Sequence, residues 1–225
     1  MYIEFNRNAI NPIECFRQSW HLVKDQYWMF LLISVVSMVL GSAAPLGLLL
    51  GPMMCGLYLC YFKKMDGERV SFDILFKGFD FFKNSLIATL IQVVPIMVIS
   101  LPFSFFIIAM TLGNSRRSGP PDPSVMLPVI FGSVGLMMGI GILIGIVFIF
   151  VFPLIADKNL SGFEAVKIAI SAAFANFWGI LGLFGVGFIC GLVGLAFCYV
   201  GAFFILPITF GAYAVAYRQV FPAKS

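Results

Sequence analysis

The sequence predicts an all-α integral membrane protein with six transmembrane helices, and three observations lead to this fold class. Of the 225 residues, 61% are hydrophobic and 11% are charged, against roughly 45–50% and 25% in an ordinary soluble domain. The mean hydropathy is +1.03. Four long segments contain no Asp, Glu, Lys or Arg, namely residues 26–62, 84–113, 125–156 and 175–217. A bilayer tolerates such unbroken apolar runs and water does not.

The lengths of these segments give the number of spans. The first and last are each about 40 residues long, which as a single helix would be about 60 Å, twice the hydrocarbon thickness of a bilayer. Each is therefore predicted to fold back as a hairpin. The first turn is expected at residues 41–47, which combine Gly, Ser and Pro, and the last near residues 196–201. The two middle segments suffice for one tilted helix each.

The two middle spans contain prolines that should bend them, and a loop joins the two. Pro95 and Pro102 are expected to kink the third span, and Pro153 the end of the fourth. Residues 113–124 contain several Gly, Pro and Ser residues and should form an irregular outer loop.

The distribution of basic residues predicts the orientation. Of the fourteen Lys and Arg residues, only Arg116 and Arg117 fall on the outer side of the six-span topology. Lys and Arg concentrate in cytoplasmic loops. We therefore expect both termini in the cytoplasm and the protein in a bacterial inner membrane.

An internal repeat organises the chain as one membrane domain, residues 1–225, of three units at about 10–64, 70–156 and 160–220. Asn11-Pro-Ile-Glu14 and Ser161-Gly-Phe-Glu164 both resemble capping boxes, 150 residues apart. An amphipathic stretch follows each box, with apolar residues Ile13, Phe16, Trp20, Val23 and Tyr27 in the first and Phe163, Val166, Ile170, Ala173 and Phe177 in the last. Each stretch leads into a hairpin at Trp28 or Trp178. The repeats are parallel, because each unit crosses the membrane twice.

The second helix of these two hairpins carries a shared motif, Pro-x3-Gly-x-Tyr-x3-aromatic. Its candidate structural residues are Pro52, Gly56, Tyr58 and Phe62 in the first copy and Pro207, Gly211, Tyr213 and Tyr217 in the last. We expect matched kinks, with the tyrosines as available donors for backbone carbonyls that proline leaves unpaired. A looser third copy begins at Ser71. A helical period there would place Phe72, Leu75, Phe76, Phe79 and Phe82 on one face.

The chain resembles bacterial polytopic membrane proteins of unknown function, and is similar to the membrane domain attached to some glycerophosphodiester phosphodiesterases. The residues that carry this resemblance are Gly51-Pro52-x3-Gly56, Gly67-Glu68-x-x-Ser71-Phe72 with Phe76-x-Gly78-Phe79, Asp157-x7-Ala165 and Pro207-x5-Tyr213. The resemblance implies an architecture and no catalytic motif, since the soluble phosphodiesterase domain is absent from this sequence.

Candidate functional residues within the spans are few. Gln92, one helical turn before Pro95, is the best intramembrane polar candidate, although such an amide more often bonds to a neighbouring helix. His21 is the only histidine, and its surroundings give no reason to expect a metal or cofactor. Asp157, at the end of the fourth span, is expected to be a loop or capping residue.

Glycines at four-residue spacing mark the fourth and fifth spans. They are Gly135, Gly139, Gly141 and Gly145 in the fourth and Gly182, Gly185, Gly187 and Gly191 in the fifth. Small residues at this spacing let helix backbones approach closely, either within the chain or against another membrane protein.

The sequence contains no nucleophile-elbow, phosphate-loop, zinc-helix or paired-carboxylate constellation. We therefore expect no enzyme and no nucleic-acid partner. The expected function is association in the lipid bilayer as a scaffold, accessory subunit or lipid-organising element. The alternative is a passive carrier or channel for a small apolar or amphipathic molecule. The Phe-rich amphipathic stretches could either anchor at the membrane interface or dock a cytoplasmic partner.

Overall fold

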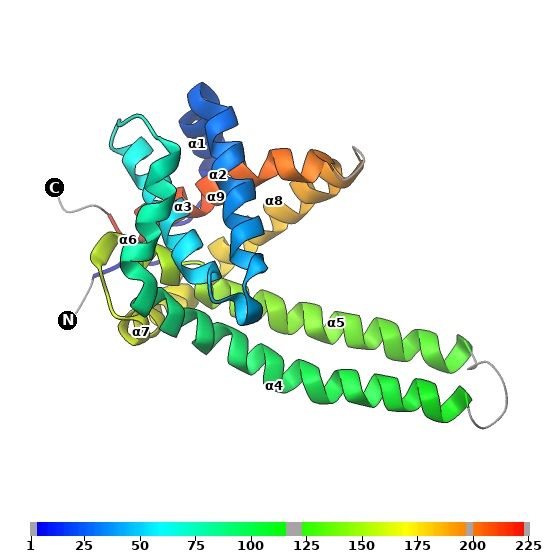
Figure 1. Ribbon diagram of the computed structural model, residues 1–225. Coiled ribbons are helices and arrows are strands. Elements are labelled where there is room, and N and C mark those ends of the chain that lie inside the picture. Colours follow the sequence, from blue (N-terminus) through cyan, green and yellow to red (C-terminus); the bar gives the residue numbers. More distant parts are fainter. Residues whose placement is uncertain (1–3, 116–122, 197–199, 223–225) are drawn as a thin grey trace. The chain divides into compact units, whose positions relative to one another are not determined.

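The computed structural model describes residues 4–115, 123–196 and 200–222 (Figure 1). These residues form helices and turns, with no strand among them. Five helical stretches are long and apolar enough to cross a membrane: Pro12–Ala43, Phe72–Phe105, Leu127–Lys158, Phe177–Gly194 and Gly201–Val220. The all-α fold class is confirmed, and the five stretches suit a multi-pass membrane protein.

The helices form two compact units, which we call unit 1 (residues 1–90 and 146–225) and unit 2 (residues 91–145). Helix α4, Phe82–Ser115, begins in unit 1 and continues into unit 2, and α5, Pro123–Phe148, returns. The other elements belong to unit 1. They are α1 (Pro12–Val23), η1 (Lys24–Gln26), α2 (Tyr27–Ala43), η2 (Pro45–Gly47), α3 (Leu50–Met65), η3 (Phe72–Phe81), α6 (Val151–Lys158), α7 (Gly162–Ala175), α8 (Phe177–Ala196) and α9 (Val200–Val220).

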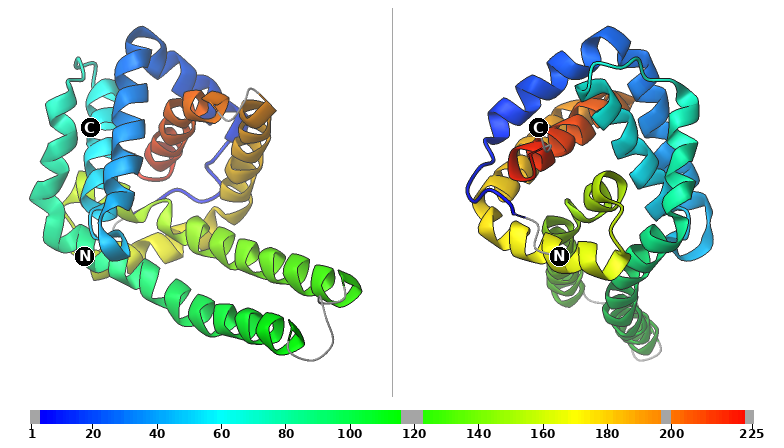
Figure 2. Two further views of the ribbon diagram at one scale, coloured as in Figure 1. Left: turned by 45° about the vertical axis from the view of Figure 1, so that its right-hand side comes forward. Right: turned by 90° about the vertical axis from the view of Figure 1, so that its left-hand side faces the viewer.

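Unit 1 is built around α9. Helices α2 and α3 form one antiparallel pair and α8 and α9 another, and α9 also packs against α1, α2 and α3. In the right-hand view of Figure 2, α9 (orange to red) runs between α1 (blue) and α3 (cyan). Helix α3 packs in turn against η3 and α6, and α6 packs against α7. The three largest of the fully buried side chains, Tyr58, Tyr61 and Tyr217, lie on α3 and α9.

The turns fall where the sequence predicts them. Helix α2 ends at Ala43 and α3 begins at Leu50, with Gly47 at a φ of +65° in the turn between them. Helix α8 ends at Ala196 and α9 begins at Val200, and the intervening residues are outside the described part of the chain. The predicted outer loop also falls largely outside it, since residues 116–122 are not described.

The break expected near Pro153 is also present. Helix α5 ends at Phe148 and α6 begins at Val151, so that Pro153 is the third residue of a new helix. A proline in the first turn of a helix removes no intrahelical hydrogen bond, because the first N–H groups have no partner within the helix.

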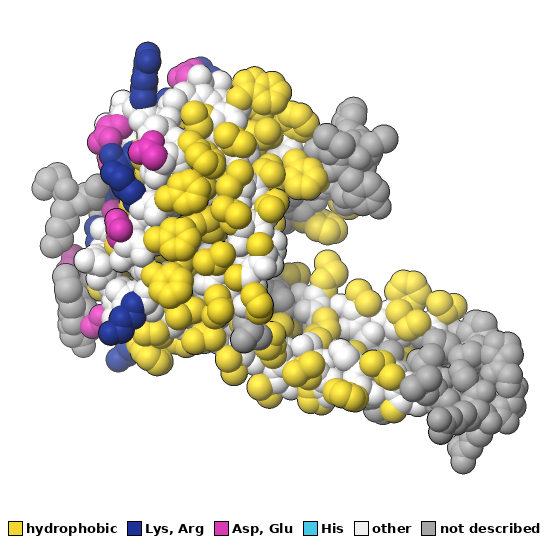
Figure 3. Space-filling model, in the orientation of Figure 1, with side chains coloured by type: hydrophobic (Ala, Val, Ile, Leu, Met, Phe, Trp, Pro, Cys, Tyr) yellow, Lys and Arg dark blue, Asp and Glu magenta, His cyan; other side chains and the backbone are white. Residues whose placement is uncertain are grey.

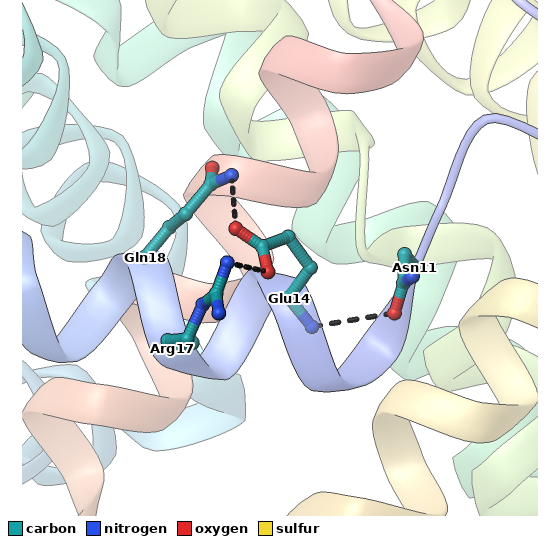
Figure 4. A network of polar contacts seen from close by, with 4 residues as sticks. All are labelled: Asn11, Glu14, Arg17 and Gln18. Carbon is teal, nitrogen blue, oxygen red and sulfur yellow. Dashed lines mark hydrogen bonds and ion pairs between the residues drawn. The ribbon is translucent and has the colours of Figure 1, made fainter.

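The two predicted capping boxes differ. Ser161 and Glu164 form the full reciprocal box at the start of α7. At the start of α1, Asn11 accepts from the N–H of Glu14 at 3.3 Å, but the Glu14 carboxylate turns to Arg17 (2.7 Å) and Gln18 (2.8 Å) instead of returning to the cap (Figure 4). The N–H of Asn11 donates to Gln219 of α9. At the start of α1, Gln219 of another helix therefore replaces Glu14 as the acceptor for the N–H of the N-cap residue.

The third amphipathic element does not present the predicted face. Residues 72–81 form a 3-10 helix, η3, in which Ile74, Leu75 and Gly78 are buried while Phe76 and Phe79 are exposed. A 3-10 helix has three residues per turn, so residues three apart form one row. The prediction assumed the α-helical period and combined Leu75 with residues that lie on the other side.

Unit 2 consists of the apolar parts of α4 and α5, which run side by side in the views of Figures 1 and 2. Helix α4 continues through both Pro95 and Pro102. The large apolar side chains of unit 2, such as Phe105 on α4 and Phe131 on α5, are mostly exposed. Such a surface suits hydrocarbon as its surroundings.

Candidate functional site

The first copy of the repeat motif forms the closest helix crossing in unit 1. A Cβ atom at Gly56 of α3 would overlap the carbonyl of Leu75 in η3, with the Leu75 carbonyl carbon at 2.8 Å. A Cβ at Gly78 of η3 would overlap the carbonyl oxygen of Pro52. Both obstacles are backbone atoms, so neither glycine can be enlarged without separating the two elements.

The two motif prolines act differently, and the prediction of matched kinks is wrong for the first of them. Pro52 is the third residue of α3, where a missing N–H leaves no bond unmade, and the following residue, Met53, already bonds back to Leu49. Pro207 lies in the interior of α9. There a proline removes one backbone bond and displaces the preceding turn, so nearby carbonyls need other donors.

Three side chains from other elements donate to carbonyls around Pro207, one of them in the displaced turn and two in the turn that follows. The hydroxyl of Tyr27, at the start of α2, donates to the carbonyl of Phe204 at 2.5 Å. Tyr61 of α3 donates to the carbonyl of Pro207 itself at 2.7 Å, and Ser19 of α1 donates to that of Ile208 at 2.6 Å. We call Ser19, Tyr27 and Tyr61 the hydroxyl triad. It joins α1, α2 and α3 to one turn of α9.

The motif tyrosines are not these donors. Tyr58 is buried and stacks on Phe62 within α3, with ring centroids 6.3 Å apart. The Tyr213 ring lies between those of Phe184 and Phe210. For the turn that Pro207 displaces, a donor from another helix is present at Phe204, but it is Tyr27 and not the tyrosine of the motif.

A charged cluster joins the end of α6 to the end of α9. One oxygen of Asp157, Oδ2, accepts from the Tyr217 hydroxyl at 2.8 Å and pairs with Lys158 at 3.0 Å. The other, Oδ1, pairs with Arg218 at 3.0 Å, and the Asp157 side chain is only 13% exposed. The Arg218 guanidinium also lies 4.5 Å from the centre of the Phe62 ring. We call these four residues of α6 and α9 the Asp157 cluster.

Sequence reasoning missed this cluster, since it treated Asp157 as a simple loop or capping residue. A signal was present: the charge-free segments 125–156 and 175–217 end directly before Asp157 and Arg218. Two opposite charges at the ends of long apolar helices are candidates to pair in a low-dielectric setting.

The start of the chain is bound beside this cluster. The N–H of Asn6 donates to the carbonyl of Val220, and its side-chain amide donates to that of Gln219. The buried amide of Asn176 accepts from the N–H of Ala9 and donates to the carbonyl of Asn6, each at 3.0 Å. The segment before α1 is thus held between α8 and the end of α9.

Gln92 of α4 lies in unit 2. Its Oε1 atom is buried and has no hydrogen-bond partner among the described residues. A functional role for Gln92 stays a prediction.

The predicted glycine faces divide into two groups. In α8, a Cβ at Gly182 would overlap Pro12 and one at Gly187 would lie 3.7 Å from Phe16, and the neighbouring Gly179 packs against Ile10, so these positions are used within unit 1. In α5, by contrast, a Cβ at Gly132, Gly135, Gly139 or Gly141 would meet no atom within 4 Å among the described residues, and Gly185 and Gly191 of α8 are equally open.

No group of three His, Cys, Asp or Glu side chains in the described part of the chain is placed to hold a metal ion. His21 is exposed on α1 beside Glu14 and Arg17, in an open polar groove. The polar arrangements described above instead join helices, because each donor and acceptor in the hydroxyl triad and the Asp157 cluster is paired with another part of unit 1.

No protein-family model, curated protein or solved structure matches this chain.

Proposed function

We propose that this chain is a non-enzymatic membrane protein that acts by associating with other components of the bilayer, as a scaffold, an accessory subunit or a lipid-organising element. The observation that carries the proposal is the open glycine face of α5. Gly135 and Gly139 are spaced for close backbone approach, and nothing described fills the space before them. Membrane helices associate through small residues at this spacing, because they gain van der Waals contact that large side chains prevent.

We propose a six-span topology with both termini in the cytoplasm of a bacterium. Helix α3, the second span of this topology and the one outside the five candidate stretches, has 16 residues, or about 24 Å of helix, against a hydrocarbon thickness of about 30 Å. Its side chains from Met53 to Phe62 are nearly all buried by protein, so it needs little contact with lipid. The concentration of Lys and Arg on one side of this topology supports the orientation.

We also propose that units 10–64 and 160–220 are a parallel repeat, and the burial of matched positions supports it. At an offset of 150 residues, five pairs are both buried: Cys15 and Ala165, Ser19 and Ala169, Val23 and Ala173, Phe30 and Ile180, Ile33 and Leu183. Two exposed pairs match as well. Ile13 and Phe163 are 75% and 68% exposed, and Trp28 and Trp178 are 70% and 77% exposed.

The alternative function is a passive carrier for a small apolar or amphipathic molecule. A groove of about 650 Å³ between α4 and α5 favours it, lined by Phe103, Ser104, Ile108, Ser133, Val134, Met137 and Met138. This volume is in the range of small-ligand sites. Methionine side chains adapt readily to different apolar guests.

Native mass measurement in mild detergent tests association against transport. For association we expect a complex larger than one chain, which Gly139→Leu reduces to the monomer. Val134→Leu, on the exposed surface of the same helix, is the matched control and should leave the complex intact. A monomer that retains a bound apolar molecule, lost in Met137→Trp, would instead support the carrier. A bare wild-type monomer contradicts both functions.

The orientation has its own test. A cysteine introduced at Ser115 should react with a membrane-impermeant reagent added outside intact cells, and one at Ser225 should react only after the cells are opened. Labelling of both positions from the same face would rule out the six-span topology.

A further inference from the structure

Helix α7 buries its small side chains and exposes its large ones. The buried positions are Ala165, Val166, Ala169, Ala172 and Ala173. The opposite surface carries Phe163, Ile170 and Phe174, which are all exposed, and Phe174 is 72% exposed. A helix on the surface of a soluble protein has the reverse arrangement, with large apolar residues turned inward.

Helix α1 has the same arrangement at the matched positions. It buries Cys15, Ser19 and Val23 against α9 and exposes Ile13 and Trp20. The predicted apolar stretches of both helices are thus divided, with part turned to the protein and the largest side chains turned away from it.

The 3-10 helix η3 presents a third exposed row. Phe76 and Phe79 of η3 and Phe82, the first residue of α4, are three residues apart and all exposed, and the rings of Phe79 and Phe82 are stacked. Lys77 and Lys83 flank this row on the exposed surface. We call the outward apolar side chains of these three stretches the aromatic collar. They are Ile13, Trp20, Phe76, Phe79, Phe82, Phe163, Ile170 and Phe174.

The collar is continuous with the surface of the candidate spans. Beyond α1, exposed apolar residues continue along α2 through Trp28, Leu32 and Val39, and beyond α7 they continue along α8 through Trp178 and Phe188. Figure 3 shows charged side chains gathered along one edge of unit 1 and hydrophobic side chains over the rest of the visible face of that unit. The exposed apolar surface of the candidate spans therefore extends onto α1 and α7.

We infer that the aromatic collar is embedded in the lipid bilayer, at the boundary between headgroups and acyl chains, and that it does not dock a cytoplasmic protein. Helices that are surrounded by lipid pack through small residues where they contact one another and turn their large apolar residues toward the lipid. Tryptophan favours the headgroup level, where its ring is apolar and its N–H stays hydrated. The flanking lysines can extend their amines toward the headgroups while their stems remain in the apolar layer.

The chain provides its own probes, since Trp20, Trp28 and Trp178 are its only tryptophans and all three are exposed at the collar or directly after it. Three variants, each retaining one tryptophan with the other two changed to Phe, are reconstituted in phosphatidylcholine and phosphatidylglycerol vesicles. Bromine on the acyl chains quenches tryptophan that touches lipid, and aqueous iodide quenches tryptophan that touches water. The position of bromine along the chain reports depth.

Each single-tryptophan variant should lose most of its emission to lipid brominated near the headgroup, less to lipid brominated near the bilayer centre, and little to iodide. As a matched control, Arg69→Trp in the tryptophan-free background, placed in the exposed loop between α3 and η3, should respond to iodide and not to bromine. Quenching of Trp20 and Trp178 by iodide alone would overturn the inference and leave the collar to a protein partner. Stronger quenching from the bilayer centre would also overturn it. Neither result depends on whether the chain associates with other proteins.

Discussion

Helices α3 and α9 carry the same motif, yet the motif holds the protein together by different means in each. In α3 the glycine of the motif is essential, because Gly56 lets the backbone of η3 contact the backbone of α3. Pro52 lies in the first turn of α3, where the missing N–H breaks no hydrogen bond. In α9 its proline has the larger consequence, because Pro207 displaces the turn before it, where Tyr27 donates to the carbonyl of Phe204, and the other two hydroxyls of the triad donate to the turn that follows. The position of a residue within its helix, and not the motif alone, determines its mechanical role.

The glycine half of this comparison predicts the largest effect. Gly56→Ala should lower the free energy of unfolding by at least about 3 kcal/mol, since the new methyl group would overlap the backbone of η3, which cannot move aside without separating η3 from α3. Gly211→Ala should cost less, about 1–2 kcal/mol, because its obstacle is the Ser19 hydroxyl, which can rotate away at the loss of one hydrogen bond. Thermal unfolding in detergent measures both.

Gly135→Ala is the control for these two substitutions. It lies in a helix, where its new methyl group meets open space, so stability should not fall. Equal losses for all three alanines would show that the close crossing does not explain the result, because Gly→Ala by itself raises helix propensity and should stabilise a helix.

The Asp157 cluster should give the next largest effect. Asp157→Asn leaves Arg218 and Lys158 without their charged partner in a largely buried setting, which should cost about 1.5–3 kcal/mol. Glu68→Gln removes the exposed pair with Lys63 and should cost less than about 1 kcal/mol. Urea or thermal unfolding that ranks the two in the opposite order would contradict the structural importance of the cluster.

The hydroxyl triad predicts a smaller change. Tyr61→Phe removes one donor to the carbonyl of Pro207 and should cost about 0.5–1.5 kcal/mol, the net contribution of one hydrogen bond. Tyr213→Phe should cost less, because the Tyr213 hydroxyl makes no hydrogen bond among the described residues. A greater loss for Tyr213→Phe in the same melting assay would restore the motif tyrosines as the donors.

The smallest expected effect concerns the capping box of α7. Hydrogen bonds from the Ser161 side chain and backbone hold the pKa of Glu164 below its usual value of 4.5. Because this pKa is lowered in the folded protein, the stabilisation is complete above pH 4.5 and fades as the pH falls through the lowered folded value. Ser161→Ala should reduce the pH dependence of the melting temperature in that acidic range, whereas Ser171→Ala, later in the same helix, should not.

The sequence predicted those features that local chemistry specifies. The breakers at residues 41–47, the proline at 153 and the Ser161 cap each act within a few residues of themselves, and the structure has a turn, a helix break and a capping box there. The 3-10 form of η3 was missed, since the hydrophobic pattern alone does not distinguish a period of 3.0 from one of 3.6. Its buried side is chosen by contact with Gly56, which lies in another helix.

The polar contacts between helices could not be predicted, for a related reason. Tyr27, Tyr61 and Ser19 each donate a hydrogen bond to a different carbonyl that is far away in sequence. Nothing in the sequence around these residues indicates which acceptor each one meets. Asp157 and Arg218 were visible as lone charges, but their pairing depends on how α6 meets α9. Sequence spacing gives candidates for such contacts and leaves the partners to the tertiary fold.

The bonds that hold the start of the chain to α9 have a consequence for folding during synthesis. They join residues 189 to 214 positions apart, from Ser19 with Ile208 to Asn6 with Val220. At a synthesis rate of roughly 5–20 residues per second, α1 waits on the order of 10–40 s for its partner to leave the ribosome. During that time Cys15, Ser19 and Val23 lack the surface that buries them in the finished protein. Helix α9, which is made long after α1, therefore completes the packing of α1.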